Sequence, residues 1–132
     1  MMLLLKTHQD HMAGVRKNRK HATDAEPRYV KHGDFLLVQV TSGPPGNEVH
    51  RVRYAMRFDS CYEDKRGESQ TIWGHQWRFI ISGYDFRLLR RPFDIEDVKV
   101  TNTNYGQGAI RFVYVHPKDE EAIVAGGYLD GV

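Results

Sequence analysis

The sequence has few of the features that tie a protein to secretion or to a membrane. It holds one cysteine, Cys61, so no disulfide can form within the chain, and this is typical of a reducing compartment. The apolar run at the start ends at Lys6, which is too short for a signal peptide or a membrane span. No later apolar run is longer. These absences predict a soluble, cytoplasmic protein with no membrane partner.

Signatures of catalysis are also missing. The chain has no glycine-rich motif that would cradle a phosphate and no signature of a nucleophile triad. It has no internal repeat, no low-complexity tract and no candidate linker. Its 132 residues are enough to bury a core without a metal or a disulfide. We therefore expect one non-catalytic domain over residues 1–132, with no cofactor.

Charge is nearly balanced in total but uneven along the chain. There are 19 Lys and Arg against 17 Asp and Glu, for a formal net charge of +2. The basic residues gather in the first half, whereas the residues from Asp119 onward include acids and no Lys or Arg. This asymmetry predicts one positive face, although a solvated loop would give the same pattern.

Apolar runs and alternation predict a mostly β protein with a few helical segments. The expected strands cover residues 2–6, 35–41, 49–58, 76–82 and 109–116. A helical turn is expected at 9–12, followed by a long loop to about residue 30. Residues 59–70 are expected to be a polar connection and 82–98 to contain short helical pieces, with Asp94 as a cap. Pro117 should stop the last strand and begin a short helix that ends at Gly126 or Gly127.

Two strands carry predictions about which side chains face the core. In residues 49–58, alternation places Val52, Tyr54, Met56 and Phe58 on a buried face, opposite three arginines. In residues 76–82 it places Trp77, Phe79 and Ile81 together. The whole pattern predicts an α+β fold, a small curved sheet or β-barrel of five or six strands with two or three short helices.

Several short motifs, in this order, resemble those of the EVE domain of the PUA-like superfamily, which also includes the YTH readers. The matching stretches are Gly14-Val15-Arg16-Lys17-Asn18, Lys31-His32-Gly33-Asp34 with the strand after it, Trp77-Arg78-Phe79-Ile80, Phe93-Asp94-Ile95 and Pro117-Lys118-Asp119-Glu120. The resemblance covers roughly residues 2 to 129. It implies a compact barrel with a pocket that holds a modified base of DNA or RNA. Relatives often carry an aromatic residue before the Gly-Val step, where this chain has Met12-Ala13, so an aromatic wall must come from elsewhere.

A flipped base is held by stacking on aromatic rings and by hydrogen bonds to its edge. Trp73, beside Gly74 and ahead of a strand, is the first candidate for the wall, and Trp77 is the second because its alternation also suits the core. Asn18 can read a base edge since its amide donates and accepts. The predicted base pocket consists of Trp73, Asn18, Trp77, Gly14, Val15 and Asp34. For Asp34 an ordinary turn contact is the competing interpretation.

Basic residues near these motifs are candidates for phosphate contacts. They are Arg16, Lys17, Arg19 and Lys20 after the first strand, and Arg51, Arg53 and Arg57 on the clearest strand. The sequence therefore predicts a nucleic-acid partner, DNA or RNA and possibly methylated.

Three other functions remain open. A magnesium nuclease could use Asp85, Asp97 and Lys99, whose order is acid followed by acid-x-Lys. A zinc site could use His8, His11 and His21, but the sequence fixes no fuller set of ligands. A protein-interaction module would fit the acidic C-terminal segment.

Overall fold

A six-stranded mixed sheet forms the centre of the protein in the computed structural model, which describes residues 1–105 and 111–132. The strand order is β2-β5-β4-β3-β1-β6. In chain order the elements are β1 (Met2–His8), the 3-10 turn η1 (Gln9–His11), α1 (Met12–Asn18), β2 (Lys20–Thr23), β3 (Phe35–Ser42), β4 (Val49–Glu63), α2 (Glu68–Trp73), β5 (Phe79–Phe93), α3 (Ile95–Val98), β6 (Phe112–Tyr114) and α4 (Pro117–Ala125).

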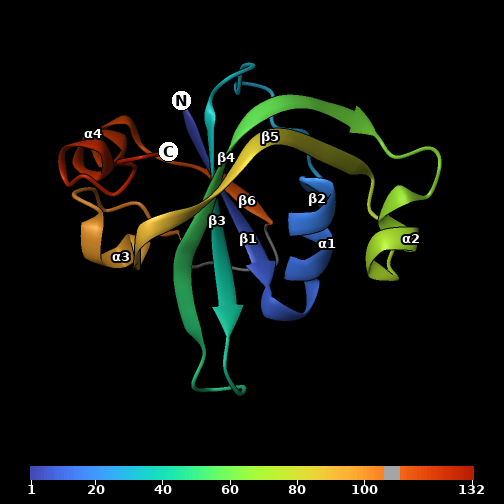
Figure 1. Cartoon of the computed structure of the whole chain (residues 1–132), viewed down its shortest axis with the longest axis horizontal. Helices are drawn as coiled ribbons and strands as arrows, with labels where there is room; N and C mark the ends of the chain where they lie inside the picture. The colour runs from blue at the N-terminus through green and yellow to red at the C-terminus, as the bar shows by residue number, and fades with distance from the viewer. Residues whose placement is uncertain (106–110) are drawn as a thin grey trace.

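The sheet is strongly curled into a half-barrel. Only β1 and β3 run parallel among the described pairs, and the other neighbours are antiparallel. Figure 1 shows α1 and α2 at one end of the molecule and α3 and α4 at the other, with the long β4 and β5 bending between them. The expected α+β class and small curved sheet are confirmed.

Both faces of the sheet carry a core, which explains why several strands are apolar without alternation. On one face Met2, Leu4 and Leu37 pack with residues of α3 and α4. On the other face Leu3, Leu5 and Leu36 belong to a second cluster inside the curl. The continuous apolar run of β1 is therefore buried on both faces of the sheet.

Most of the expected elements are present. The strands at the N-terminus and at 35–41 are confirmed as β1 and β3, and the Lys31–Asp34 turn has Gly33 at φ +90°. Asp94 caps α3 by accepting from the N–H of Glu96, and Pro117 begins α4. The last strand is confirmed as β6, although residues 109 and 110 of its predicted range lie outside the described residues.

The prediction of a long loop after the first strand was wrong. Residues Met12–Asn18 form α1 and Lys20–Thr23 form β2. Arg19 connects them in the left-handed conformation, with φ +55°, and its N–H donates to the carbonyl of Val15. The helix escaped prediction because it buries only Val15, so no apolar period is visible.

Two further predictions about the middle of the chain were wrong. Residues 59–70 are not one polar connection, since β4 continues to Glu63 and α2 begins at Glu68. The expected helical pieces before Phe93 are instead the second half of β5. Asp85 has φ +55° within that strand, and this irregularity removes the alternation by which a strand is recognised.

The expected division of faces also needs correction in β4 and β5. Val52 packs in the α3–α4 cluster whereas Met56 and Phe58 pack inside the curl, because the register shifts between Val52 and Tyr54. Trp77 lies before β5 and packs with Ile80, whereas Ile81 faces the interior of the curl. The three arginines of β4 therefore do not form one uniform face.

Candidate functional site

The two tryptophans lie at the α1–α2 end of the molecule. Trp73 is the last residue of α2, not a loop residue, and Gly74 ends the helix at φ +74°. Their rings meet edge to face at 6.1 Å between centroids. Trp77 is 8% exposed and belongs to a small cluster with Ala22 and Ile80, against which the half-buried Trp73 packs. The predicted core position of Trp77 is confirmed, and Trp73 is the more open of the two.

Asp64 fixes the segment that carries both tryptophans. Its carboxylate accepts from the backbone N–H groups of Glu68 and Ser69, from the Ser69 hydroxyl at 2.5 Å and from the Gln76 amide at 3.0 Å. Ser69 Oγ in turn accepts from the Trp77 N–H. Burial alone would raise the pKa of Asp64, but the hydrogen bonds from Ser69, Glu68 and Gln76 outweigh it and lower the pKa to about 2.

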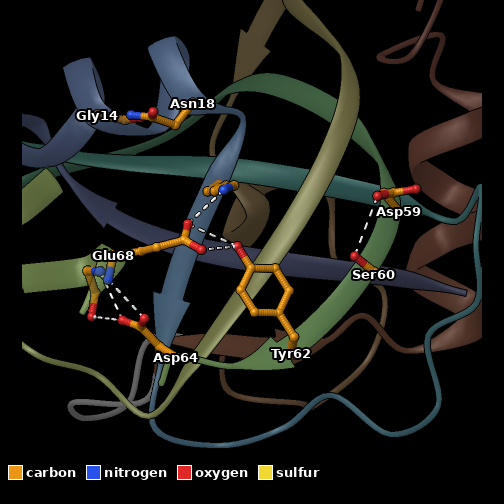
Figure 2. A network of polar contacts seen from close by, with 9 residues as sticks. Gly14, Asn18, Asp59, Ser60, Tyr62, Asp64 and Glu68 are labelled. Carbon is orange, nitrogen blue, oxygen red and sulfur yellow. Dashed lines mark hydrogen bonds and ion pairs between the residues drawn. The ribbon is translucent and has the colours of Figure 1, made fainter. Parts of the chain in front are cut away.

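A second polar network ties α2 to β2 and β4. Figure 2 shows Tyr62 and Glu68 facing each other, with the Tyr62 hydroxyl 2.9 Å from Glu68 Oε1. Lys20 Nζ lies 2.7 Å from Glu68 Oε2, and this hydrogen bond raises the pKa of Lys20 and lowers that of Glu68. A cleft of about 340 Å³ opens beside the network, lined by Tyr62, Glu63, Asp64, Lys65, Arg66 and Glu68. The carboxylates of Asp64 and Glu68 are already engaged, and Lys65 and Arg66 are exposed.

The two edges of the curled sheet meet beside the tryptophans through side chains. Arg111 precedes β6, and its Nε donates to the carbonyl of Ala22 in β2 at 2.5 Å. His21 Nε2 lies 3.1 Å from the Arg111 carbonyl, so it donates, and Nδ1 accepts from the Thr7 hydroxyl at 3.3 Å. We call Thr7, His21, Ala22 and Arg111 the seam. Burial, and then the charge of Arg111, lower the pKa of His21 to about 3, so this ring is neutral at neutral pH.

Three groups surround the Trp77 ring in addition to Trp73. The Arg111 guanidinium lies over it at 4.4 Å, the His75 ring is tilted against it at 4.4 Å, and the His11 ring meets its edge at 6.1 Å. His75 is exposed. We call Trp73, Trp77, His11, His75 and Arg111 the tryptophan cluster. A cation over an indole contributes about 0.5 to 2 kcal/mol, more as water is excluded.

His11 contributes an unsatisfied polar atom to this cluster. Its Nδ1 is buried and has no hydrogen-bond partner among the described residues. Burial, and then the charge of Arg111, lower the pKa of His11, so the ring is neutral at neutral pH. A neutral imidazole has one donor and one acceptor nitrogen, and a buried one without a partner costs about 1 to 3 kcal/mol. Such an atom is a place where a ligand or a water would be held.

Helix α1 is pressed against Trp73. The indole Nε1 donates to the carbonyl of His11 at 3.1 Å. A Cβ added to Gly14 would lie 2.6 Å from both Trp73 Nε1 and a methyl of Ile72. Gly14 is therefore required by this close approach. Val15, the next residue, is the buried residue of the same helix, at 1% exposure.

The predicted basic residues divide between free and engaged side chains. Arg16, Lys17 and Arg19 are exposed on α1 and just after it, next to the tryptophan cluster. Lys20 is paired with Glu68. Arg57 stacks on Phe35 with its guanidinium carbon 3.7 Å from the ring centre and donates to the carbonyl of Gly33. Arg51 is exposed and Arg53 half-buried, and both lie in β4 away from α1.

Two residues of the predicted base pocket, Asn18 and Asp34, make hydrogen bonds to nearby backbone groups instead. Asn18 is exposed, and its amide donates to the Gly14 carbonyl at 2.9 Å within α1, as Figure 2 shows by their side-by-side position. Asp34 accepts from the Lys31 N–H at 2.8 Å and lies near the N-terminal amine, beside the start of β1. The tryptophan cluster lies beyond the other end of β1, about 20 Å away at ~3.3 Å per residue. The structure thus makes Asp34 a turn residue.

The residues of the competing enzymatic hypotheses lie apart. Asp85 is exposed in β5 and pairs with Arg87, whereas Asp97 is in α3 and Lys99 pairs with Glu96. His8 contacts the Asp10 carboxylate, and both ring nitrogens of His21 are hydrogen-bonded, to the Arg111 carbonyl and the Thr7 hydroxyl. No group of three or more His, Cys, Asp or Glu in residues 1–105 and 111–132 is arranged to hold a metal ion. Burial raises the pKa of Cys61 to about 11, so its thiol is protonated at neutral pH.

Sequence reasoning missed His11, His75, Arg111 and Asp64 as members of this region. His11 and Arg111 are brought to the tryptophans by the pairing of strands far apart in the sequence, which no local pattern reports. Asp64 lies close in sequence, but its role depends on the turn before α2, which the sequence did not reveal. His75 stands between the two tryptophans in the sequence, so a search for aromatic rings near them would find it.

Comparison with family models and with curated proteins found no match for this chain. The resemblance to the EVE domain therefore stays a prediction. No helix in the described part of the chain is long and apolar enough to cross a membrane.

Proposed function

We propose that the chain is a non-catalytic nucleic-acid-binding domain that holds a base at the tryptophan cluster. The observation that carries the proposal is the surroundings of Trp77, whose indole is covered by a guanidinium and by an exposed imidazole at the same distance of 4.4 Å. Stacked rings with an arginine are the elements by which proteins hold unpaired bases.

The base takes the place of the His75 ring against Trp77. His75 lies in the short turn between α2 and β5, and its side chain is exposed, so the imidazole can rotate away from the indole while the backbone of the turn stays held. When the imidazole swings out, the indole face and the buried Nδ1 of His11 become available to one planar ligand. The ligand then gains both a stacking surface and a hydrogen-bond partner.

The charges beside the cluster suit the backbone that carries such a base. Arg16, Lys17 and Arg19 lie on and next to α1, and Lys65 and Arg66 lie beside α2. These five exposed cations flank the two tryptophans, and each phosphate they neutralise adds salt-dependent affinity. Recognition of a modified, flipped-out base, as in the EVE domains that the sequence resembles, is the form of binding we propose.

The test is a titration of intrinsic tryptophan fluorescence with short DNA and RNA oligonucleotides, unmodified or carrying 5-methylcytosine or N6-methyladenine. We expect Trp77→Leu to weaken binding of the preferred oligonucleotide about 5- to 150-fold, the equivalent of one stacked base. Tyr29→Ala is the matched control, because Tyr29 is 69% exposed and lies in the segment between β2 and β3. Equal binding by wild type and a folded Trp77→Leu variant would contradict the proposal.

A further inference from the structure

A cavity separate from the tryptophan cluster lies where β6 ends and α4 begins. Its volume is about 450 Å³, within the range of about 300 to 1,000 Å³ that small-molecule sites occupy. Its walls are Met1, Thr103 and the stretch from Tyr114 to Pro117, with Glu120 from α4. We call it the α4 cavity. It lies at the start of β1, whereas the tryptophan cluster lies beyond the other end of that strand.

The cavity forms where the chain passes from a strand into a helix. β6 ends at Tyr114, and the N–H of the next residue, Val115, donates to the Met2 carbonyl at 3.0 Å. α4 then begins at Pro117, so a helix follows instead of a longer strand. The Met2 N–H donates to Glu120 Oε1 at 2.6 Å. A side chain of α4 therefore takes the place that a longer β6 would fill beside β1, and the cavity opens there.

One carboxylate sets the charge of the α4 cavity. Among the described residues that line it, Glu120 is the one Asp or Glu, and there is no Lys or Arg. The ammonium group of Met1 lies 3.5 Å from the Asp34 carboxylate, which balances its charge. Glu120 is half-buried and accepts from the Met2 N–H, but the two oxygens of a carboxylate can accept about four hydrogen bonds. Glu120 can therefore bind a further donor.

The start of α4 does not offer the cavity a site for an anion. The Lys118 N–H donates to His116 Nδ1, and the N–H groups of Asp119 and Glu120 donate to the His116 carbonyl. These donors, which could otherwise bind an anion, are used within the helix. Asp119 is buried and adds a second carboxylate to the first turn. The charge around the cavity thus favours a cation.

The rest of the lining favours an apolar body of small size. Val115 is buried, and Met1, Tyr114 and Pro117 add further apolar atoms. Covering these atoms removes apolar surface from water, which stabilises a complex. A protein partner would need about 20 surface residues or more on each side. The α4 cavity is instead bounded by one strand end, the first turns of one helix and two further residues, which suits a small molecule.

We propose that the α4 cavity binds a small organic amine, with the ammonium group on Glu120 and the apolar body against Val115 and Pro117. The proposal is independent of the nucleic-acid site. The start of β1 and the tryptophan cluster are about 20 Å apart at ~3.3 Å per residue, and the two sites take ligands of opposite charge. Failure of either proposal leaves the other as it is.

The experiment is a two-dimensional amide NMR titration of the full chain with three ligands of similar shape, namely phenethylamine, phenylethanol and phenylacetate. We expect phenethylamine to bind about tenfold or more tightly than the neutral alcohol, because a charge-assisted hydrogen bond is stronger than a neutral one. Phenylacetate should not bind. The amides of Val115, His116 and Glu120 should shift, whereas those of Ser69 and His75 should stay in place. Phenylacetate that binds as well as phenethylamine, or phenethylamine that leaves those three amides unmoved, would overturn the proposal.

The variant Glu120→Gln separates the charge from the fold. Glutamine keeps an oxygen that can accept from the Met2 N–H but carries no charge. We expect phenethylamine binding to weaken about tenfold or more and phenylethanol binding to be unchanged. Glu121→Gln is the matched control, since Glu121 is the exposed next residue of α4 and is not among the residues that line the cavity. Equal loss of amine binding in the two variants, or no loss in a folded Glu120→Gln protein, would overturn the proposal. If Glu120→Gln does not fold, the comparison of the three ligands on the wild type still decides.

Discussion

The two ends of the molecule are built around the same device and expose opposite chemistry. At the α1–α2 end, buried Asp64 accepts hydrogen bonds from the start of α2 and from Gln76. At the α3–α4 end, buried Asp119 accepts from the N–H groups of Val100 and Thr101, from the Thr101 hydroxyl and from Tyr105. Asp64 thus fixes the turn at Gln76 to the start of α2, and Asp119 fixes the segment at Val100 and Thr101 to α4.

What surrounds the two carboxylates differs. Tyr105, at the α4 end, is 1% exposed. Its hydroxyl donates to Asp119 and accepts from the His116 N–H. A cavity of about 450 Å³ at that end contains Glu120, and exposed Glu121 and Asp130 lie in the same C-terminal segment. At the other end Trp73 and His75 are partly open beside a basic helix. The comparison separates a region whose polar groups are used within the fold from the region where we propose that an anionic aromatic ligand binds.

Removing the two carboxylates should break this comparison most strongly. Asp119→Ala leaves several buried donors without an acceptor, and we expect a loss of about 3 kcal/mol or more in the free energy of unfolding. Oligonucleotide affinity of the remaining folded protein should be unchanged. Asp64→Ala should cost about 2 to 3 kcal/mol and also lower affinity, since Trp77 loses its positioning through Ser69. Urea unfolding and binding titrations measure both, and equal affinity loss in the two variants would contradict the account.

Acid should destabilise the protein in two pH ranges, the first through His21 at the α1–α2 end and the second through the buried carboxylates of both ends. Since burial and Arg111 lower the pKa of His21 to about 3, the unfolded chain binds a proton between pH 6.5 and 3 that the folded chain does not. The seam's contribution is therefore complete above about pH 6.5 and falls as pH drops, by up to about 1.4 kcal/mol per pH unit. The hydrogen-bonded Asp64 and Asp119, whose pKa values are lowered, add losses only below about pH 4.

Urea midpoints measured from pH 7 to pH 4 test this order. His21→Gln should flatten the profile in that range, whereas the exposed His32→Gln should follow wild type. A His21→Gln profile as steep as wild type would show that other groups carry the pH dependence.

The substitution Gly14→Ala should show whether helix propensity or the packing of α1 on Trp73 determines the stability at this position. In an open helix Gly→Ala stabilises by about 1 kcal/mol, but here the Cβ would lie 2.6 Å from Ile72 and Trp73. We expect Gly14→Ala to destabilise by about 1 to 3 kcal/mol and to change the fluorescence of Trp73. Thermal unfolding monitored at the indole band is the measurement, with Ala13→Gly as the helix-propensity control. A stabilised Gly14→Ala protein would mean that α1 does not press on Trp73.

Neutralising exposed charges should have the smallest effect of these changes. Neutralising Arg16 and Lys17 with glutamine should lower affinity for a 16-mer several-fold at low salt and reduce the salt slope by about 1.4, with the unfolding midpoint unchanged. Neutralising Glu121 and Asp130 at the acidic end should leave the slope as it is. Equal changes from the two double variants would remove the distinction between the ends.

How much of this could be predicted from the sequence depends on what each element buries. β1, β3 and α4 were predicted because apolar runs, a glycine turn and Pro117 mark them locally. α1 and β2 were not, since they bury Val15, Ala22, His21 and Thr23, and two of these four residues are polar. The twists in β4 and β5 come from bulges that alternation cannot show. The tryptophan pair was visible in the sequence, but Arg111 reaches it only because the curled sheet brings its two edges together.

One measurement tests the central claim most directly, namely the indole and backbone amide signals of the labelled protein in a two-dimensional NMR titration with the preferred oligonucleotide. The account predicts that the Nε1–H signals of Trp73 and Trp77 shift and saturate together with the amide of His75, while the amides of Val100, Thr101 and Asp119 stay in place. Saturating oligonucleotide that leaves both indole signals unmoved would contradict it, and shifts confined to the α3–α4 end would place binding at the wrong end of the molecule.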